Sequence, residues 1–256
     1  MLDELVLGAL ADAAIRRERR PLSKVEAEAL AQTPPLDALA ALAPRENVHI
    51  IAEVKRSSPS KGTLAAIADP AALALDYQSG GASAVSVLTE GRRFGGSLED
   101  LVAIRRAVSI PVLRKDFIAE PYQLLEARAA GADLALLIVA ALDNATLTEL
   151  FKLTNELGMT ALVETHSADE VERALDLGAD LIGVNARDLS TFELDQDLFG
   201  SLADRIPSGV IRVAESAVQS AADVAHYRRA GADVVLVGEA LVTSDPVATL
   251  SEFLAV

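Results

Sequence analysis

The sequence predicts an α/β protein, a single (β/α)8 TIM barrel with an N-terminal helical extension. The chain has 256 residues, close to the roughly 250 that are typical of one such barrel. Eight short apolar runs alternate with helical segments, and no change in composition divides the chain. Strict alternation favours a parallel sheet. Eight repeats favour a closed barrel, although an open doubly wound sheet fits the same pattern.

The eight apolar runs are the predicted strands. Val, Ile and Leu dominate them, and most are continuously apolar, as expected of strands that are covered on both faces. Between the runs, apolar residues recur at helical spacing, as at Tyr122, Leu125 and Ala129. The strands are expected at 48–54, 83–88, 110–113, 134–139, 160–163, 181–184, 210–214 and 234–237.

A repeated tetrapeptide precedes several of these strands. It is Gly-Gly-Ala-Ser at 80–83, Ala-Gly-Ala-Asp at 130–133 and 230–233, and Leu-Gly-Ala-Asp at 177–180. Glycine readily ends a helix because it has no Cβ and tolerates the left-handed conformation that a C-cap needs. Each tetrapeptide therefore indicates a helix end followed by a short turn into a strand.

The first part of the chain does not fit the repeat. Residues 2–19 have the pattern of an amphipathic helix, and several prolines interrupt the segment that follows. A segment this short and this rich in proline cannot bury a core of its own. We therefore expect one domain, in which 1–46 form a helical extension and 47–256 form the barrel.

Composition and charge exclude several classes of function. The chain has no cysteine, which excludes disulfides and thiolate metal sites, and its three histidines lack the spacing of metal ligands, so no metal site is expected. The net charge of −15 would repel a phosphate backbone, so nucleic-acid binding is not expected. No apolar run is long enough to span a bilayer, and the charge order at the start is the reverse of a secretory signal. We expect a cytoplasmic protein without membrane contacts.

Charged or amide side chains stand at the ends of five predicted strands. The carboxyl ends of the strands are where TIM barrels place their catalytic groups. A single such residue is most often an ordinary exposed side chain, but five strand ends at one rim indicate an active site with Lys and Glu as general acid and base. The candidates are Glu53, Lys55, Lys115, Glu164, Asn185 and Glu215.

The loops after the seventh and eighth strands usually hold phosphate in this fold. Gly238 follows the eighth strand, and glycine lets backbone N–H groups approach an anion. A polar stretch at 57–62 follows the first strand and is typical of a surface turn, or of a mobile lid that carries phosphate donors. The phosphate-binding candidates are Lys55, Ser58, Ser216, Ala217, Gly238 and Glu239.

Several of these segments together resemble the indole-3-glycerol-phosphate synthase family. The matches occur in the right order and with the spacing of the barrel. The N-terminal extension is similar to the family's extra helices, which lie over the mouth of the active site. The matching segments are IAEVKRSSPSKG at 51–62, PVLRKDF at 111–117, PYQ at 121–123, LVE at 162–164, GVNARDL at 183–189 and AES at 214–216.

The resemblance implies ring closure of 1-(2-carboxyphenylamino)-1-deoxyribulose 5-phosphate to indole-3-glycerol phosphate, with loss of CO2 and water, in tryptophan biosynthesis. No cofactor and no metal take part. Lys115 is implied as the general acid that protonates the ribulose carbonyl oxygen, and Glu164 and Lys55 as the acid and base candidates for dehydration. Which lysine serves each step stays open. The residues implied to position the lysines and the substrate hydroxyl groups are Glu53, Asn185 and Glu215.

A second group of residues is expected to bind the substrate. Arg187 suits the anthranilate carboxylate, because a guanidinium matches carboxylate geometry. The large apolar members would form the walls around the aryl ring, although Leu136 is equally well interpreted as ordinary core packing. The group consists of Ser58, Phe94, Phe117, Leu136, Arg187, Leu189, Ser216 and Leu236.

Two positions depart from the family. Ala217 stands where glycine is common, and Arg93 stands where many relatives have a second aromatic residue. If φ at Ala217 is positive, alanine is strained and phosphate binding weakens; if φ is negative, alanine merely adds a methyl group. Both changes concern substrate affinity more than the type of reaction.

Two other functions are compatible with these residues. One is a Schiff-base lyase in which Lys55 or Lys115 attacks a sugar carbonyl. The other is a protein that binds a phosphate ligand without turnover. The expected partner is a small sugar phosphate in each case. The expected assembly is a monomer or weak homo-oligomer, and contact with other tryptophan-pathway enzymes is compatible with it.

Overall fold

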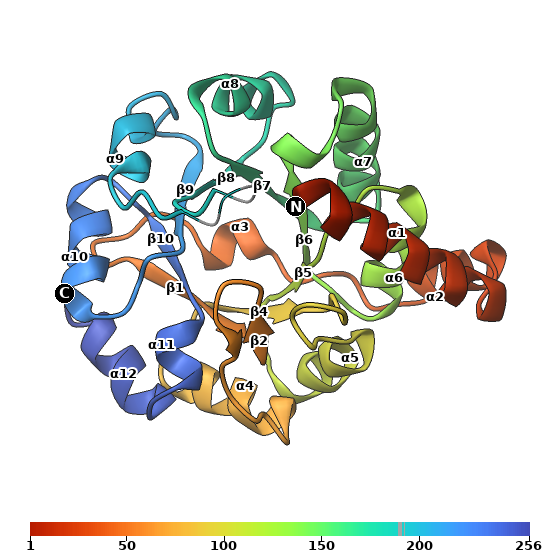
Figure 1. The fold of residues 1–256 in the computed structure, drawn as a ribbon, viewed down its shortest axis with the longest axis horizontal. Helices are drawn as coiled ribbons and strands as arrows, with labels where there is room; N and C mark the ends of the chain where they lie inside the picture. Colours follow the sequence, from red (N-terminus) through yellow and green to blue (C-terminus); the bar gives the residue numbers. More distant parts are fainter. Residues whose placement is uncertain (189–190, 192) are drawn as a thin grey trace.

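Parallel strands close into a barrel in the computed structural model, which describes residues 1–188, 191 and 193–256. The order around the barrel is β1-β10-β9-β8-β7-β6-β5-β4 (Figure 1). This order confirms the predicted (β/α)8 barrel and rules out the open sheet. The strands of the barrel are β1 (His49–Val54), β4 (Ala84–Leu88), β5 (Val112–Lys115), β6 (Leu134–Ile138), β7 (Thr160–Thr165), β8 (Leu181–Asn185), β9 (Ile211–Glu215) and β10 (Val234–Val237).

Helices surround the barrel (Figure 1). Several begin at a residue whose side chain accepts a hydrogen bond from the first turn, as Ser97 and Ser167 do. Within the described ranges no helix has both the length and the apolar character needed to cross a membrane. The helical elements after β1 are α4 (Pro70–Ser79), α5 (Leu98–Ala107), α6 (Pro121–Ala129), η1 (Val139–Ala141), α7 (Asn144–Glu156), α8 (Ala168–Asp176), α9 (Leu198–Ala203), α10 (Ala221–Arg229), α11 (Glu239–Val242) and α12 (Pro246–Phe253).

The repeated tetrapeptides end helices as predicted. Gly81, Gly131, Gly178 and Gly231 have φ angles of 97°, 90°, 76° and 94°, a left-handed conformation in which a Cβ would be strained. A strand begins three residues after each of these glycines. The tetrapeptide is therefore the local signal that sets the spacing between helix and strand around the barrel.

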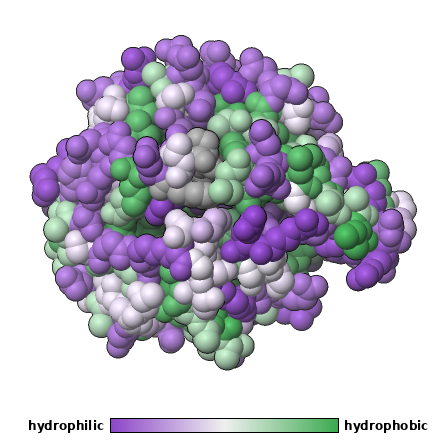
Figure 2. Space-filling model, viewed as in Figure 1, coloured by the Kyte–Doolittle hydropathy of each residue, from purple (hydrophilic) through white to green (hydrophobic). Residues whose placement is uncertain are grey.

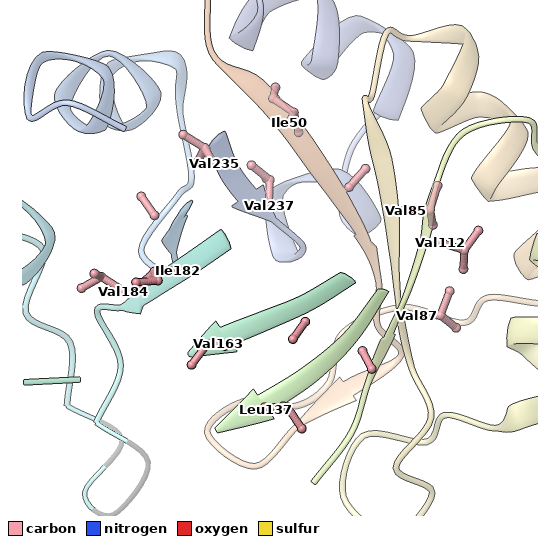
Figure 3. Packing of buried hydrophobic residues seen from close by; sticks show 14 of the residues in the cluster. Ile50, Val85, Val87, Val112, Leu137, Val163, Ile182, Val184, Val235 and Val237 are labelled. Atoms are coloured by element: carbon pink, nitrogen blue, oxygen red, sulfur yellow. The ribbon is translucent and has the colours of Figure 1, made fainter. Parts of the chain in front are cut away.

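The strands separate two hydrophobic cores. On their outer face, residues such as Val163 and Val237 pack beneath the helices (Figure 3). On their inner face, residues such as Ile51 and Leu162 fill the barrel. Because successive side chains of a strand point to opposite faces, every second residue along a strand reaches the interior.

The N-terminal extension consists of α1 (Leu2–Arg19), α2 (Leu22–Leu30) and α3 (Ala38–Ala41). The first of these helices has the bounds that the sequence predicted. Leu5 of α1 packs against the inner core of the barrel. Arg16, further along α1, makes hydrogen bonds of 2.6 and 2.7 Å to the two carboxylate oxygens of Glu126, a buried residue of α6. This bidentate pair fixes the direction of α1 on the barrel.

The amino ends of the strands are closed by the segment around α3. Ala38 and Leu42 are fully buried in the inner core beside Leu134, the first residue of β6. His49, the first residue of β1, has its Nε2 atom 2.9 Å from the carbonyl oxygen of Ala43. Apolar side chains therefore seal the amino end of the barrel.

Candidate active site

A pocket of about 680 Å³ opens at the carboxyl ends of the strands. In the space-filling view, hydrophilic and hydrophobic residues are interspersed around a hollow near the centre of this face (Figure 2). Every site residue predicted from the sequence lines the pocket, except Leu189, which lies outside the described residues. The lining residues of this set are Glu53, Lys55, Ser58, Phe94, Lys115, Phe117, Leu136, Glu164, Asn185, Arg187, Glu215, Ser216, Ala217, Leu236, Gly238 and Glu239.

The alternation along the strands carries the charged side chains into the pocket. Ile51 of β1 belongs to the inner core, and Glu53 and Lys55 follow it at intervals of two residues. Three other strands repeat this pattern, since an inner-core residue precedes the charged residue by two positions. These pairs are Leu113 and Lys115, Leu162 and Glu164, and Val213 and Glu215.

Lys115 stands at the centre of the charged residues. Its Nζ atom lies 2.9 Å from Glu215 Oε2, 3.6 Å from Glu164 Oε2 and 3.8 Å from Glu53 Oε2. Burial favours the neutral amine, but the attraction of Glu215, Glu164 and Glu53 outweighs burial and raises the pKa of Lys115. Lys115 is therefore an ammonium group at neutral pH, and it can neutralise negative charge that forms on a bound molecule.

Glu53 lies between the two lysines of the pocket. Its Oε1 atom is 2.7 Å from Lys55 Nζ, while its Oε2 atom faces Lys115. Burial favours the neutral acid, but Lys55 and Lys115 lower the pKa of Glu53 below its usual value. Two lysines that are distant in the chain thus converge on one carboxylate.

Asn185 links the carboxylate of Glu164 to the loop after β9. Its Nδ2 atom donates to Glu164 Oε1 at 3.2 Å. Its Oδ1 atom accepts from Ser216 Oγ at 2.7 Å and from the backbone N–H of Arg187 at 3.0 Å. These bonds hold the amide in one orientation, with its donor directed at Glu164.

Glu164 and Glu215 are neighbouring buried carboxyl groups with opposite pKa shifts. Burial favours the neutral form of Glu164, but Lys115, His166 and Asn185 lower its pKa to about 2. Burial raises the pKa of Glu215, with Lys115 acting against this shift and Glu164 adding to it. The pKa values of the two carboxyl groups are therefore moved apart, the pattern that separates an acid from a base in one site.

Two glycines make room for these carboxylates, and neither role was predicted from the sequence. A Cβ on Gly183 of β8 would overlap Glu215 Oε1. A Cβ on Gly238 would lie 2.7 Å from Glu53 Oε1 and 3.1 Å from Lys55 Nζ. The sequence predicts Gly238 as a phosphate-binding residue, and the structure shows in addition that a side chain at this position would collide with Glu53.

Apolar side chains also line the pocket. The rings of Phe94 and Phe117 lie 6.1 Å apart between centroids at an interplanar angle of 40°. Leu136 and Leu236 belong to the inner core and also line the pocket. Leu136 therefore packs in the core and borders the pocket, which is compatible with both interpretations of the sequence. Several further lining residues were not predicted, among them Leu5, Leu88 and Ile138; the alternation from Leu136 could have indicated Ile138.

The loop after β9 is strained. Ser216 and Ala217 have φ angles of 70° and 58°, which are left-handed conformations that cost a residue with a Cβ roughly 1–2 kcal/mol. The sequence left two interpretations of Ala217 open, and the structure selects the strained one. The loop is held by the hydrogen bond from Ser216 Oγ to Asn185.

The stretch at 57–62 contains a small hairpin at the rim of the pocket. Its strands are β2 (Ser57–Ser58) and β3 (Gly62–Thr63). Ser57 donates through its N–H to the carbonyl of Phe94 at 3.2 Å and through Oγ to the carbonyl of Arg93 at 2.9 Å. Lys61 forms an ion pair with Glu239, which directly follows the neighbouring strand β10. The hairpin thus spans the rim between the loops that follow β4 and β10.

Sequence reasoning also missed His166, which directly follows β7. Its side chain is 14% exposed and lies between Glu164 and Glu170. The signal was available, because His166 is two residues beyond Glu164 and side chains at that interval share a face. Apart from residues 189–190 and 192, no group of three or more His, Asp or Glu side chains has an arrangement that could hold a metal ion.

Comparisons with known proteins show which family the chain is similar to. A family model described as indole-3-glycerol phosphate synthase matches residues 2–253. A protein of that name from Leifsonia xyli subsp. xyli is 72% identical over 99% of this chain and 97% of its own length. Those from Mycobacteroides abscessus and Mycobacterium tuberculosis are 58% and 57% identical, over 96% and 98% of this chain and 90% and 93% of their own.

A solved structure of lower similarity supports the fold alone. It is an N-acetylmannosamine-6-phosphate 2-epimerase from Clostridium perfringens, with a TM-score of 0.60 and 13% identity. The match covers 82% of this chain and 93% of the epimerase chain.

Proposed function

The chain belongs to the indole-3-glycerol phosphate synthase family, and we propose that the pocket at the carboxyl end of its barrel is the active site for this reaction. The protein is a carboxy-lyase of tryptophan biosynthesis. Its substrate is 1-(2-carboxyphenylamino)-1-deoxyribulose 5-phosphate, and its products are indole-3-glycerol phosphate, CO2 and water. The observation that carries the proposal is the buried ammonium group of Lys115 among the carboxylates of Glu53, Glu164 and Glu215.

Lys115 acts as the general acid of ring closure. The aryl carbon that bears the carboxylate attacks the ribulose carbonyl carbon, and the carbonyl oxygen takes the proton of the Lys115 ammonium. Loss of CO2 then restores the aromatic ring. A preorganised ammonium in a dry pocket stabilises the oxygen charge that develops in this step. The raised pKa of Lys115 also argues against a Schiff base, which requires a neutral amine as the nucleophile.

Glu164 and Lys55 act in the dehydration that follows. Glu164 is the base, since its lowered pKa keeps it an ionised carboxylate, and Lys55 is the acid that helps the hydroxyl group to leave as water. Glu53 holds Lys55 directly, and Asn185 orients Glu164 through the hydrogen bond described above. Glu215 positions Lys115 through a hydrogen bond of 2.9 Å.

The apolar wall and the loops orient the substrate. The aryl ring lies between Phe94 and Phe117, against Leu136 and Leu236, and the anthranilate carboxylate is bound by Arg187. Leu189 is retained as a further candidate for this wall. The phosphate group binds at the rim formed by Lys55, Ser58, Ser216, Ala217, Gly238 and Glu239. The Glu239 carboxylate is neutralised by Lys61, so its backbone N–H is the group that can meet the phosphate.

The test is turnover by the purified protein. Added substrate should give the fluorescence of an indole product. Lys115→Met should lower kcat by about 10²–10⁴-fold, the range for loss of a general acid. Lys152→Met is the matched control, because Lys152 lies on α7 with 76% of its side chain exposed. Normal turnover by Lys115→Met would contradict the role of Lys115, and no turnover by the unchanged protein would contradict the proposed function.

We also propose a cytoplasmic enzyme that works as a monomer or weak homo-oligomer and binds a small sugar phosphate but no nucleic acid. The net charge of −15 supports the last point. Residues 1–46 and 47–256 act as one domain, which is supported by the Arg16–Glu126 pair and by Leu5 in the pocket. Light scattering of the pure protein, alone and with other tryptophan-pathway enzymes, would test the assembly.

A further inference from the structure

His166 occupies an unusual place behind the proposed base. Its Nε2 atom lies 3.5 Å from Glu164 Oε1, and its Nδ1 atom lies 3.2 Å from Glu170 Oε2 on α8. Glu170 Oε2 also accepts the backbone N–H of His166 at 2.9 Å, so the ring is tied to α8. The buried Nε2 atom makes no hydrogen bond with the described residues, and the Glu164 carboxylate is the group that it faces.

The charges around this ring favour an imidazolium. Glu170 faces it from α8 and Glu164 from β7. Burial lowers the pKa of His166, but the two carboxylates outweigh burial and raise it to about 10. His166 therefore carries a positive charge at neutral pH.

Glu164 consequently lies between two cations. Lys115 from β5 is 3.6 Å from Glu164 Oε2, on the pocket side, and His166 approaches Oε1 from behind. Asn185 from β8 donates to the same Oε1 atom, and Glu215 from β9 is the neighbouring carboxyl group. Of the two cations, Lys115 lines the pocket and His166 does not.

The difference between the two cations matters during the reaction. When the Lys115 ammonium gives its proton to the carbonyl oxygen, it becomes a neutral amine and no longer attracts the Glu164 carboxylate. Resting on the proposed function, we propose that His166 is a positioning residue: held by Glu170, its imidazolium orients Glu164 and keeps it ionised as the base after Lys115 has given up its proton. His166 itself does not transfer a proton in this step.

The first test is the pH profile of His166→Asn. This change removes the charge and keeps a polar side chain. We expect kcat to fall about tenfold with little change in KM. The acid limb of kcat should also move upward by about one pH unit, because Glu164 is easier to protonate without the imidazolium beside it; one pKa unit corresponds to about 1.4 kcal/mol. His226→Asn is the matched control, since His226 lies on α10 and does not line the pocket. A uniform loss of kcat at every pH, or an unchanged profile, would overturn the proposal.

The second test does not depend on turnover. The chain has three histidines, so their ring resonances can be assigned one by one in a nitrogen-15 NMR titration. The His166 ring should remain an imidazolium well above pH 8. In Glu170→Gln, which replaces one of its two carboxylates, the titration should move to lower pH, and kcat should fall in the same direction as in His166→Asn but less. A His166 ring that titrates at or below its ordinary pKa would refute the ion pair, even if the unchanged protein turns over its substrate normally.

Discussion

The two ends of this barrel are built from the same strands and have opposite character. At the amino end, Leu42 and Ala38 fill the space between the strands, and His49 is buried with its ring nitrogens 2.7 Å from Ser83 Oγ and 2.9 Å from the Ala43 carbonyl. At the carboxyl end, His166 is also largely buried, but its neighbours are Glu164 and Glu170.

The pKa values of the two histidines are therefore shifted in opposite directions. Burial lowers the pKa of His49, because its neutral partners do not compensate for the loss of water. Carboxylates raise the pKa of His166 to about 10 against the effect of burial. The partners of a buried ring, rather than burial itself, therefore decide its charge. The amino end of the barrel is packed with apolar side chains, and the carboxyl end holds charged side chains in fixed positions.

The largest expected effect is on the stability of the sealed end. Leu42→Ala should lower the free energy of unfolding by about 2–5 kcal/mol, because it leaves a cavity in the inner core. Urea denaturation would measure this change. Leu30→Ala on α2 is the control, since that leucine is 74% exposed and should cost little. A large rise in KM for Leu42→Ala at a temperature where it is folded would break the division of roles between the two ends.

The next effect is on activity at the mouth. Gly183→Ala should lower kcat about a hundredfold, because its Cβ would displace the Glu215 carboxylate that holds Lys115, and a shift of about 1 Å can cost this much. Gly209→Ala is the control, since no atom lies within 4 Å of its added Cβ. Steady-state kinetics would decide, and full activity of Gly183→Ala would show that the carboxylate is free to move.

A smaller effect is the pH dependence of stability. The folded pKa of His166 is raised from 6.5 to about 10, so its contribution is fully present below pH 6.5 and is lost as the pH rises towards 10. The folded pKa of His49 is lowered, so its contribution is present above pH 6.5 and is lost as the pH falls. The deficit in Tm of His166→Gln should shrink towards pH 10, and that of His49→Gln should shrink below pH 6. Parallel deficits at all pH values would contradict the difference between the ends.

The smallest effect concerns the strained loop at the mouth. Ala217→Gly should raise the free energy of unfolding by up to about 1 kcal/mol, because relief of the left-handed strain exceeds the added entropy of the unfolded chain. Ala27→Gly in the exposed part of α2 should instead lower it by about 1 kcal/mol. Urea denaturation of both variants would measure the contrast. Equal losses would show that the φ of 58° at Ala217 carries no strain.

Much of the fold and the site is legible in local sequence because the responsible forces act over a few residues. The glycine of each tetrapeptide ends a helix through its own backbone freedom, as at Gly131 and Gly231. The interval of two between Ile51, Glu53 and Lys55 follows from the pleat of a single strand. These periodicities predicted the barrel and the charged residues at its strand ends, such as Glu53 and Lys55.

Only the tertiary structure decided which of those residues touch. Gly183 meets Glu215, Leu5 of α1 reaches the pocket, and Ala217 adopts a positive φ through contacts between segments that are distant in the chain. The charge of His166 likewise depends on how closely α8 brings Glu170 to the end of β7. Such contacts depend on closure of the barrel to within a few tenths of an ångström, because steric overlap and electrostatic attraction change steeply over that distance.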